Sequence, residues 1–253
     1  MIVRSSQFEA FKFCPRFGHF MYDLGLRLKG DGVNPDLFFG KVLHKGTELF
    51  HNHSLDTALD YLRDLPWPQH ATKTLGRANA FLKMYAAENP VKMLETEKPF
   101  TFRVGVHTWK GRWDGVGLYQ GDKWVVENKT TIPYYLTLKP NDQMMAYWMG
   151  GKVYYQDVKG IFVNNFDIQK MRIIRTPMTI FQQDFDSWLE ETKLFLAFIT
   201  RCQSAGVYPT GASCMRYNSK CIFRKLCRSE PEIWGTLIKK CFVVSKEQKE
   251  LDW

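Results

Sequence analysis

The chain has 253 residues, 45% of them hydrophobic and 15% aromatic, so it can bury a substantial core and is not a disordered tail. Its 35 lysines and arginines outnumber its 26 aspartates and glutamates, and the formal charge of +9 favours a polyanionic partner, most often nucleic acid. No apolar run approaches the roughly 18 residues that span a bilayer, and the start of the chain lacks the apolar stretch of a secretory signal. We therefore expect a cytoplasmic protein, or one of the host cytoplasm if a phage encodes it, whose six cysteines are not a disulfide framework.

Helical patterns dominate residues 1–90. Ser6 and Glu9 have the spacing of a capping box and predict the start of the first helix. Two more helices are expected at about 37–51 and 72–87, and the second of these ends before a proline.

The middle of the chain changes to strand patterns. Residues 98–119 are rich in Phe, Val, Trp and Tyr with period-two alternation, residues 120–123 form a turn, and 124–130 are the returning strand. Further elements are expected in this order: a helix at 141–150 capped by Asn141 or Asp142, strands near 158–163 and 170–175, and an amphipathic helix at 181–199.

These elements predict an α/β fold organised as one domain over residues 1–253, not as two independent domains. Its parts are a helical N-terminal part at 1–90, an α/β core at 95–205 and a cysteine-bearing basic part at 206–253.

The predicted hairpin places two acids and one lysine on the same face. With Gly121 and Asp122 as the loop residues, Asp114 lies opposite Lys129, and Glu127 shares their face. Two carboxylates suit Mg²⁺ or Mn²⁺, which can hold a phosphodiester oxygen and lower the pKa of a bound water, while a lysine orients that water. An ordinary cross-strand ion pair on a surface hairpin is the alternative that this pattern leaves open.

The order Gly111-Arg112-Trp113-Asp114-Gly115, followed by the strand at 124–130, resembles the PD-(D/E)XK nuclease superfamily. The resemblance is to the branch that contains RecB-type nuclease domains and the CRISPR-associated iron–sulfur exonucleases. Asp114 stands at the acid of its G-x-x-D strand, and Glu127 and Lys129 stand at its (D/E)-x-K strand, whereas Trp113 replaces the usual proline. The resemblance implies a restriction-endonuclease-like core, in which a central mixed sheet is flanked by helices.

Two further motifs extend the resemblance. Gly40-Lys41-Val42-Leu43-His44 is similar to the G-x-x-x-H helix start whose histidine is a third metal ligand in this branch. Gln143 and Tyr147 match its Q-x-x-x-Y motif and share one helical face. A structural histidine and ordinary packing are the alternatives for these residues. An acidic position of the branch falls at Glu95 or Glu97, and the sequence does not choose between them.

Four cysteines resemble the split [4Fe–4S] site of the iron–sulfur nucleases: Cys14, Cys214, Cys221 and Cys227. Zinc also accepts four thiolates, but structural zinc sites usually have C-x2–4-C pairs, which this C-x6-C-x5-C run lacks. The cluster would join the N- and C-terminal elements and close a loop of about 200 residues. Cys202 and Cys241 match nothing in the branch.

No acidic residue lies between 213 and 228, where five cations are candidates for DNA-backbone contacts: Arg216, Lys220, Arg224, Lys225 and Arg228. Tyr217 and Phe223 are interleaved with them and are candidates for base stacking. A solvated basic loop is the alternative.

The resemblance implies a Mg²⁺- or Mn²⁺-dependent deoxyribonuclease. We expect an exonuclease that acts on single-stranded DNA or DNA ends in recombination, repair or processing. The alternative is a non-cleaving, DNA-binding recombination accessory protein with an iron–sulfur cluster. No G-x-x-x-x-G-K-[ST] loop is present, so an ATP-driven helicase, or a recombinase, would be a separate partner.

The resemblance gives six residues roles in the reaction. They are the metal ligands His44, Asp114 and Glu127, the water-positioning Lys129, and the nucleotide contacts Gln143 and Tyr147.

Overall fold

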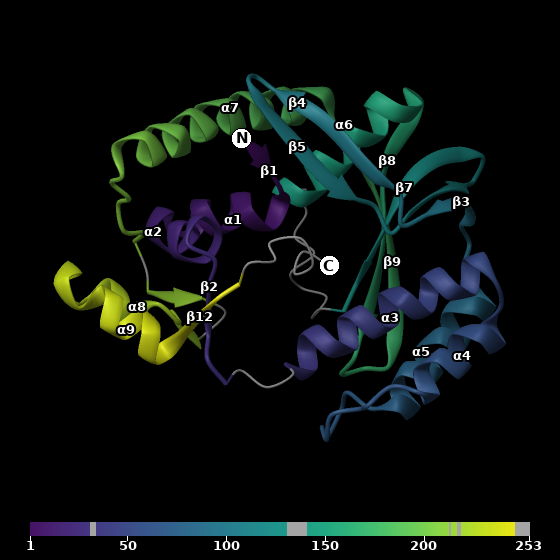
Figure 1. Ribbon diagram of the computed structural model, residues 1–253. Coiled ribbons are helices and arrows are strands. Elements are labelled where there is room, and N and C mark those ends of the chain that lie inside the picture. The colour runs from purple at the N-terminus through teal and green to yellow at the C-terminus, as the bar shows by residue number, and fades with distance from the viewer. Residues whose placement is uncertain (31–33, 131–140, 213, 217–218, 246–253) are drawn as a thin grey trace. The chain divides into compact units, whose positions relative to one another are not determined.

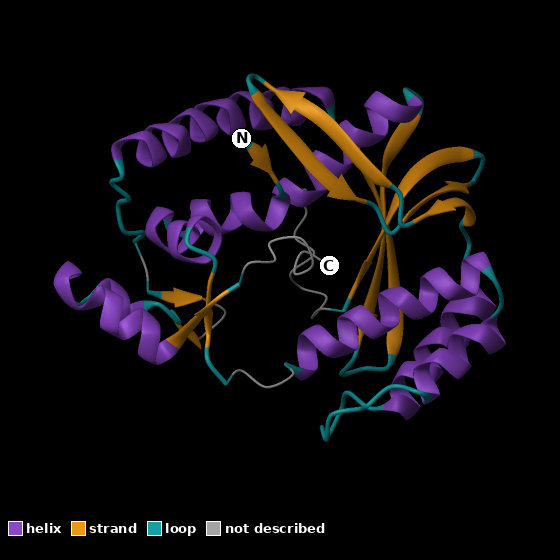
Figure 2. Cartoon of the chain, in the orientation of Figure 1, coloured by secondary structure: helices purple, strands orange, loops and turns teal. Residues whose placement is uncertain are grey.

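A computed structural model describes residues 1–30, 34–130, 141–212, 214–216 and 219–245 (Figures 1 and 2). The chain divides into two compact units. The sheet unit comprises Val33–Arg103 and Thr108–Trp188, and the cysteine unit comprises Met1–Gly32, Val104–His107 and Leu189–Trp253. This division does not test whether the chain is one folding domain, so the single domain stays a prediction.

The sheet unit is built on a five-stranded mixed sheet, in the order β3 (Lys92–Thr96), β6 (Gly115–Tyr119), β7 (Asp122–Lys129), β8 (Val158–Asp167) and β9 (Arg172–Thr179). Strands β7 and β8 are parallel, and the other neighbours are antiparallel. Residues 124–128 are buried without interruption, as expected of a central strand with both faces covered.

Four helices flank this sheet: α3 (Pro35–Asn52), α4 (Leu55–Arg63), α5 (Leu75–Glu88) and α6 (Asp142–Tyr155). Each begins after a residue whose side chain accepts a backbone N–H of the first turn: Asn34, Ser54, Thr74 and Asn141. Helices α3, α4 and α5 lie together (Figure 1) and share an apolar core with Phe166 of β8. Helix α6 contacts β7 and β8. The predicted α/β class, with a mixed sheet and flanking helices, is therefore confirmed.

The hairpin formed by β6 and β7 has a different register from the one predicted. Its two loop residues are Gln120 and Gly121, with φ angles of +52° and +86°, as a type I′ turn requires. Tyr119 pairs with Asp122 and Gly115 with Val126, so the predicted opposition of Asp114 and Lys129 is wrong. Because the register differs by two residues, each side chain keeps its predicted face.

A second hairpin precedes β6. It consists of β4 (Pro99–Val104) and β5 (His107–Arg112), and its turn contains Gly105 with a φ of +58°. The predicted strand region 98–119 therefore contains three strands, β4, β5 and β6. Alternate residues of β4 are buried, so one face of this hairpin joins the core and the other does not.

The cysteine unit holds short elements from both ends of the chain: β1 (Ile2–Val3), α1 (Ser5–Phe13), α2 (Pro15–Gly18), a π-helix η1 (His19–Asp23), β2 (Leu26–Leu28), β10 (Met215–Arg216), β11 (Ser219–Lys220), α8 (Arg224–Cys227), η3 (Pro231–Ile233), α9 (Trp234–Cys241) and β12 (Phe242–Val244). Helix α7 (Gln182–Ala205) begins in the sheet unit, and its residues from Leu189 onward belong to the cysteine unit. It ends before Gly206, whose φ is +66°. Helix α1 begins at Ser5 after Arg4, so the predicted capping box at Ser6 is wrong.

Strands β2 and β12 pair antiparallel, which joins the N-terminal segment to the C-terminal segment. Phe17, Phe20 and Phe223 form part of one buried cluster in the same unit. Among the described helices, none has the length and apolar character that a membrane crossing requires.

Candidate active site

Three potential metal ligands from separate elements converge in the sheet unit. His44 on α3, Glu97 between β3 and β4, and Asp114 before β6 each offer a ligand atom, and these atoms lie within 4.8 Å of one another. Nδ1 of His44 is 3.0 Å from Oδ1 of Asp114. The backbone N–H of Asn128 donates to Oδ2 of Asp114 at 2.6 Å. Asp114 is thereby connected to both α3 and β7.

Trp113 fixes the backbone that carries Asp114. Its indole is fully buried, stacks on Phe100 with ring centroids 4.7 Å apart, and donates from Nε1 to the carbonyl of Tyr147 at 3.2 Å. The tryptophan that replaces the usual proline thus connects Asp114 to helix α6. Gly115 follows directly, and an added Cβ there would come within 2.9 Å of the Glu95 carbonyl, so glycine allows β3 to approach β6 closely.

Glu97 is the acidic residue that the sequence left undecided. Its φ is +48°, a left-handed conformation that is uncommon for a residue with a side chain. Its backbone N–H donates to the carbonyl of Asp114 at 3.1 Å, so this hydrogen bond holds the bend beside Asp114. Glu95 instead contacts Lys98 and Tyr155, each at 2.6 Å. Glu97, not Glu95, therefore joins His44 and Asp114.

Glu127 and Lys129 lie on the face of β7 that meets α6. Glu127 is only 2% exposed, and its Oε1 is 2.5 Å from Nζ of Lys129. Its Oε2 is buried and has no hydrogen-bond partner among the described residues. Nζ of Lys129 also donates to Oε1 of Gln143 at 2.6 Å, and Nε2 of Gln143 donates to the hydroxyl of Tyr147 at 3.0 Å. The structure thus brings all six predicted residues of the reaction into one region.

Asn128 stands between Glu127 and Lys129 and points to the opposite face. Its Oδ1 accepts from Asn164 of β8 at 3.0 Å, and its Nδ2 donates to the hydroxyl of Thr47 on α3 at 3.4 Å. That hydroxyl in turn donates to the carbonyl of His44 at 2.9 Å. Buried hydrogen bonds therefore connect the backbone of His44 to the strand that carries Glu127 and Lys129.

The carboxylates concentrate negative charge in a region where Glu127 is buried and Asp114 and Glu97 are partly buried. Burial, together with nearby Asp114, raises the pKa of Glu97 to about 7. Burial also raises the pKa of Glu127 to about 7, and Asp114 adds to this shift although Lys129 opposes it. Burial alone would lower the pKa of His44, but Asp114 outweighs it and the pKa rises to about 9. Such a group of carboxylates and an imidazole, with one buried oxygen lacking a partner, fits a hard divalent cation.

The six predicted reaction residues stand at the motif positions that the sequence shares with a nuclease superfamily, and a sequence model tests this resemblance. A sequence model described as the PD-(D/E)XK nuclease superfamily matches residues 5–228. The chain belongs to the PD-(D/E)XK nuclease superfamily. Nucleases of this superfamily use divalent metal ions, and the group formed by His44, Glu97 and Asp114 is a possible site for one.

Comparison with solved structures gives the same fold. A crystal structure described as "Putative exonuclease" from Eubacterium rectale has a TM-score of 0.57 and 12% sequence identity, and the match covers 92% of this chain and 91% of that chain. A second structure, that of SSO0001, has a TM-score of 0.41 and 14% identity over 77% of this chain and 76% of that chain, and it is too distant to carry an argument. A search of curated proteins found no match.

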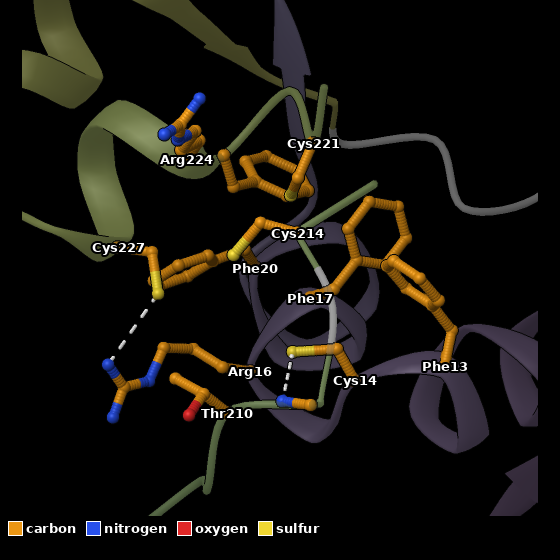
Figure 3. Close-up of a pocket in the computed structure, with 12 residues that line it drawn as sticks. Phe13, Cys14, Arg16, Phe17, Phe20, Thr210, Cys214, Cys221, Arg224 and Cys227 are labelled. Carbon is orange, nitrogen blue, oxygen red and sulfur yellow. Dashed lines mark hydrogen bonds between the residues drawn. The ribbon is translucent and has the colours of Figure 1, made fainter. Parts of the chain in front are cut away.

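In the cysteine unit of this nuclease-superfamily chain, the four predicted cluster ligands line one pocket (Figure 3): Cys14, Cys214, Cys221 and Cys227. The backbone N–H of Gly211 donates to the sulfur of Cys14 at 3.1 Å, and Arg16 donates to the sulfur of Cys227 at 3.6 Å. Burial raises the pKa of Cys221, and the other three thiols add to this shift. Cys202 and Cys241 do not line the pocket.

The spacing of these sulfurs bears on which group the pocket could hold. A tetrahedral zinc with bonds of about 2.3 Å brings its sulfurs to roughly 3.8 Å from one another. Within the part of the chain that the structure describes, no three of the four sulfurs lie within 4.8 Å of one another. In this structure the four sulfurs are therefore not gathered as closely as the ligands of a bound zinc ion.

The acid-free stretch at 213–228 is only partly described. Lys220, Lys225 and Arg228 are exposed, whereas Arg224 lines the cysteine pocket. The side chain of Arg216 and all of Tyr217 lie outside the described residues. Phe223 is 1% exposed and packs against Phe17 and Phe20, so its predicted role in base stacking is wrong. The DNA contacts of the cations stay a prediction.

Proposed function

We propose that this protein is a Mg²⁺- or Mn²⁺-dependent DNA nuclease that acts as an exonuclease on single-stranded DNA or DNA ends. The observation that carries the proposal is the convergence of His44, Glu97 and Asp114 beside the buried Glu127 and its lysine partner, in a chain of a nuclease superfamily. Carboxylates and one imidazole supply the hard ligands that these cations prefer.

Four residues would hold the cation: His44, Glu97, Asp114 and Glu127. When bound, the cation would polarise the phosphodiester and lower the pKa of an attacking water. Nζ of Lys129, fixed by Gln143, would orient that water and offset charge that develops on the phosphate. Tyr147 would hold Gln143 in turn and contact the nucleotide at the cleavage point.

The same proposal assigns a [4Fe–4S] cluster to Cys14, Cys214, Cys221 and Cys227. Four thiols line one pocket, and their C-x6-C-x5-C spacing lacks the C-x2–4-C pairs of structural zinc sites, which supports iron–sulfur over zinc. The cluster would act as a structural clasp that adds to the pairing of β2 with β12. Cations of the 213–228 stretch would then hold DNA beside the cluster.

The proposal is tested by degradation of end-labelled linear and circular single-stranded DNA with Mn²⁺, and with EDTA as a control. We expect the wild-type protein to degrade linear DNA only in the presence of metal. Asp114→Ala and Lys129→Ala should lose activity by roughly 100-fold or more. The matched variants Asp64→Ala and Lys83→Ala remove exposed charges of the same kind in the sheet unit and should keep it.

Undiminished activity of Asp114→Ala would contradict the assignment of the site. Degradation of the circular substrate at the rate of the linear one would contradict exonuclease action. A wild-type protein that binds DNA but cleaves neither substrate with any metal would support the non-cleaving accessory function instead.

A further inference from the structure

The β4–β5 hairpin is a cationic element beside the candidate metal site. Residues 98–113 contain no Asp or Glu, and they carry four lysines or arginines: Lys98, Arg103, Lys110 and Arg112. The nuclease motifs overlap this segment only at Gly111-Arg112-Trp113, and they give its cations no role. The segment nevertheless ends directly before Asp114.

The pleat of the two strands separates apolar from charged side chains. Phe100, Phe102 and Trp109 are 1–5% exposed and form the inner face. Thr101 and Arg103 alternate with them on β4 and are exposed, as is Lys110 on β5. Lys110 and Arg112 are two residues apart, so they share a face at a spacing of about 7 Å, which can meet successive phosphates of an extended strand.

The outward face is the one opposite the inner aromatic face, and it carries Arg103, Lys110 and Arg112. It leads toward the candidate metal ligand Glu97. Nη1 of Arg112 lies 3.3 Å from Oε2 of Glu97. Arg103 and Lys110 differ from it, since neither forms an ion pair or hydrogen bond with another described residue. The hairpin thus presents two uncompensated cations and continues into an arginine that touches a candidate ligand.

We propose that the outward face of the β4–β5 hairpin binds the phosphate backbone of the single-stranded DNA substrate and guides it to the metal site. This inference rests on the proposed nuclease function. Uncompensated cations are suited to phosphate oxygens. The aromatic rings of the hairpin are buried on the inner face, so this surface offers no base stacking and binds without sequence preference.

The test is the salt dependence of DNA binding, measured with a fluorescent 20-nucleotide oligo(dT) and with Asp114→Asn as the parent, so that cleavage does not interfere. Into this parent we introduce Arg103→Gln with Lys110→Gln. Each lost phosphate contact lowers the slope of log affinity against log salt by about 0.7, so the double variant should lose about 1.4 from its slope and bind more weakly.

The matched control carries Lys83→Gln with Lys170→Gln, which removes two exposed charges of the sheet unit away from the hairpin and should keep the slope of the parent. Equal slopes in the hairpin and control variants, with both proteins folded by circular dichroism, would overturn the inference and leave the nuclease function standing. A parent that does not bind the oligonucleotide at all would overturn the proposed DNA substrate, and the inference with it.

Discussion

Glu95 and Glu97 are two positions apart in the chain, yet their side chains meet different partners. Strand alternation predicts that both point the same way, so the sequence gives no reason to prefer one. The left-handed φ of +48° at Glu97 ends this alternation and places its carboxylate with His44 and Asp114. Motif spacing located His44, Asp114, Glu127 and Lys129. It left the acidic position open between Glu95 and Glu97, because a backbone bend of this kind has no sequence signal in a glutamate.

Replacing Glu97 by glutamine removes one negative oxygen from the candidate site. Because a divalent cation then loses a charged ligand, Glu97→Gln should raise the Mn²⁺ concentration for half-maximal DNA degradation by roughly 10-fold or more. Glu95→Gln is the matched control and should keep the wild-type requirement. Equal requirements in the two variants would remove Glu97 from the site.

At the scale of elements, the turn between β6 and β7 shows how far pattern reasoning reaches. The alternation and Gly121 were enough to predict a hairpin with its acids on one face. They were not enough to choose its register, because Gln120 has to adopt a positive φ for the loop to be Gln120-Gly121, and glutamine gives no sign of this. The shift by two residues leaves the face of Glu127 unchanged, so the candidate site was predictable although the pairing was not.

The packing of α3 against α5 makes stability depend on pH through His51. Nε2 of His51 is 2.9 Å from the buried hydroxyl of Tyr85, and burial lowers the pKa of His51 from 6.5 to about 4. Between these values the unfolded chain binds a proton that the folded chain does not. The free energy of unfolding should therefore fall as pH decreases from 6.5 toward 4.

His51→Gln removes this titrating group, so its free energy of unfolding should change less between pH 7 and pH 5 than that of the wild type. Urea denaturation at the two pH values measures the difference. His53→Gln replaces an exposed neighbour and should keep the wild-type pH dependence. If the His51 and wild-type proteins lost equal stability over this range, protonation of His51 would not be the cause.

At the scale of the whole molecule, segments that are about 200 residues apart meet in the cysteine unit. The cysteines were visible in the sequence, but the pairing of β2 with β12 was not, because three-residue strands carry too little periodicity to predict. The buried Phe223 shows a further limit, since a phenylalanine among basic residues looks like a stacking platform until its packing is known. The resemblance therefore indicated the cysteines that line the pocket better than the residues packed around them.

Cys14→Ser should remove one ligand of the proposed cluster. We expect anaerobically purified wild-type protein to be brown with a broad absorbance shoulder near 400 nm, and Cys14→Ser to lose this colour and its iron and to unfold at a lower temperature. Cys202→Ser changes a cysteine outside the pocket and should keep the colour. A colourless wild-type protein that contains zinc would contradict the iron–sulfur assignment.

The claim on which the rest depends is that the group around Asp114 binds a divalent cation. Calorimetric titration with Mn²⁺ in the absence of nucleic acid measures this directly. We expect saturable binding by the wild-type protein, loss of that binding in Asp114→Asn, and wild-type binding in the exposed control Asp64→Asn. Mn²⁺ binding that is the same in Asp114→Asn as in the wild type, or absent from the wild type, would contradict it.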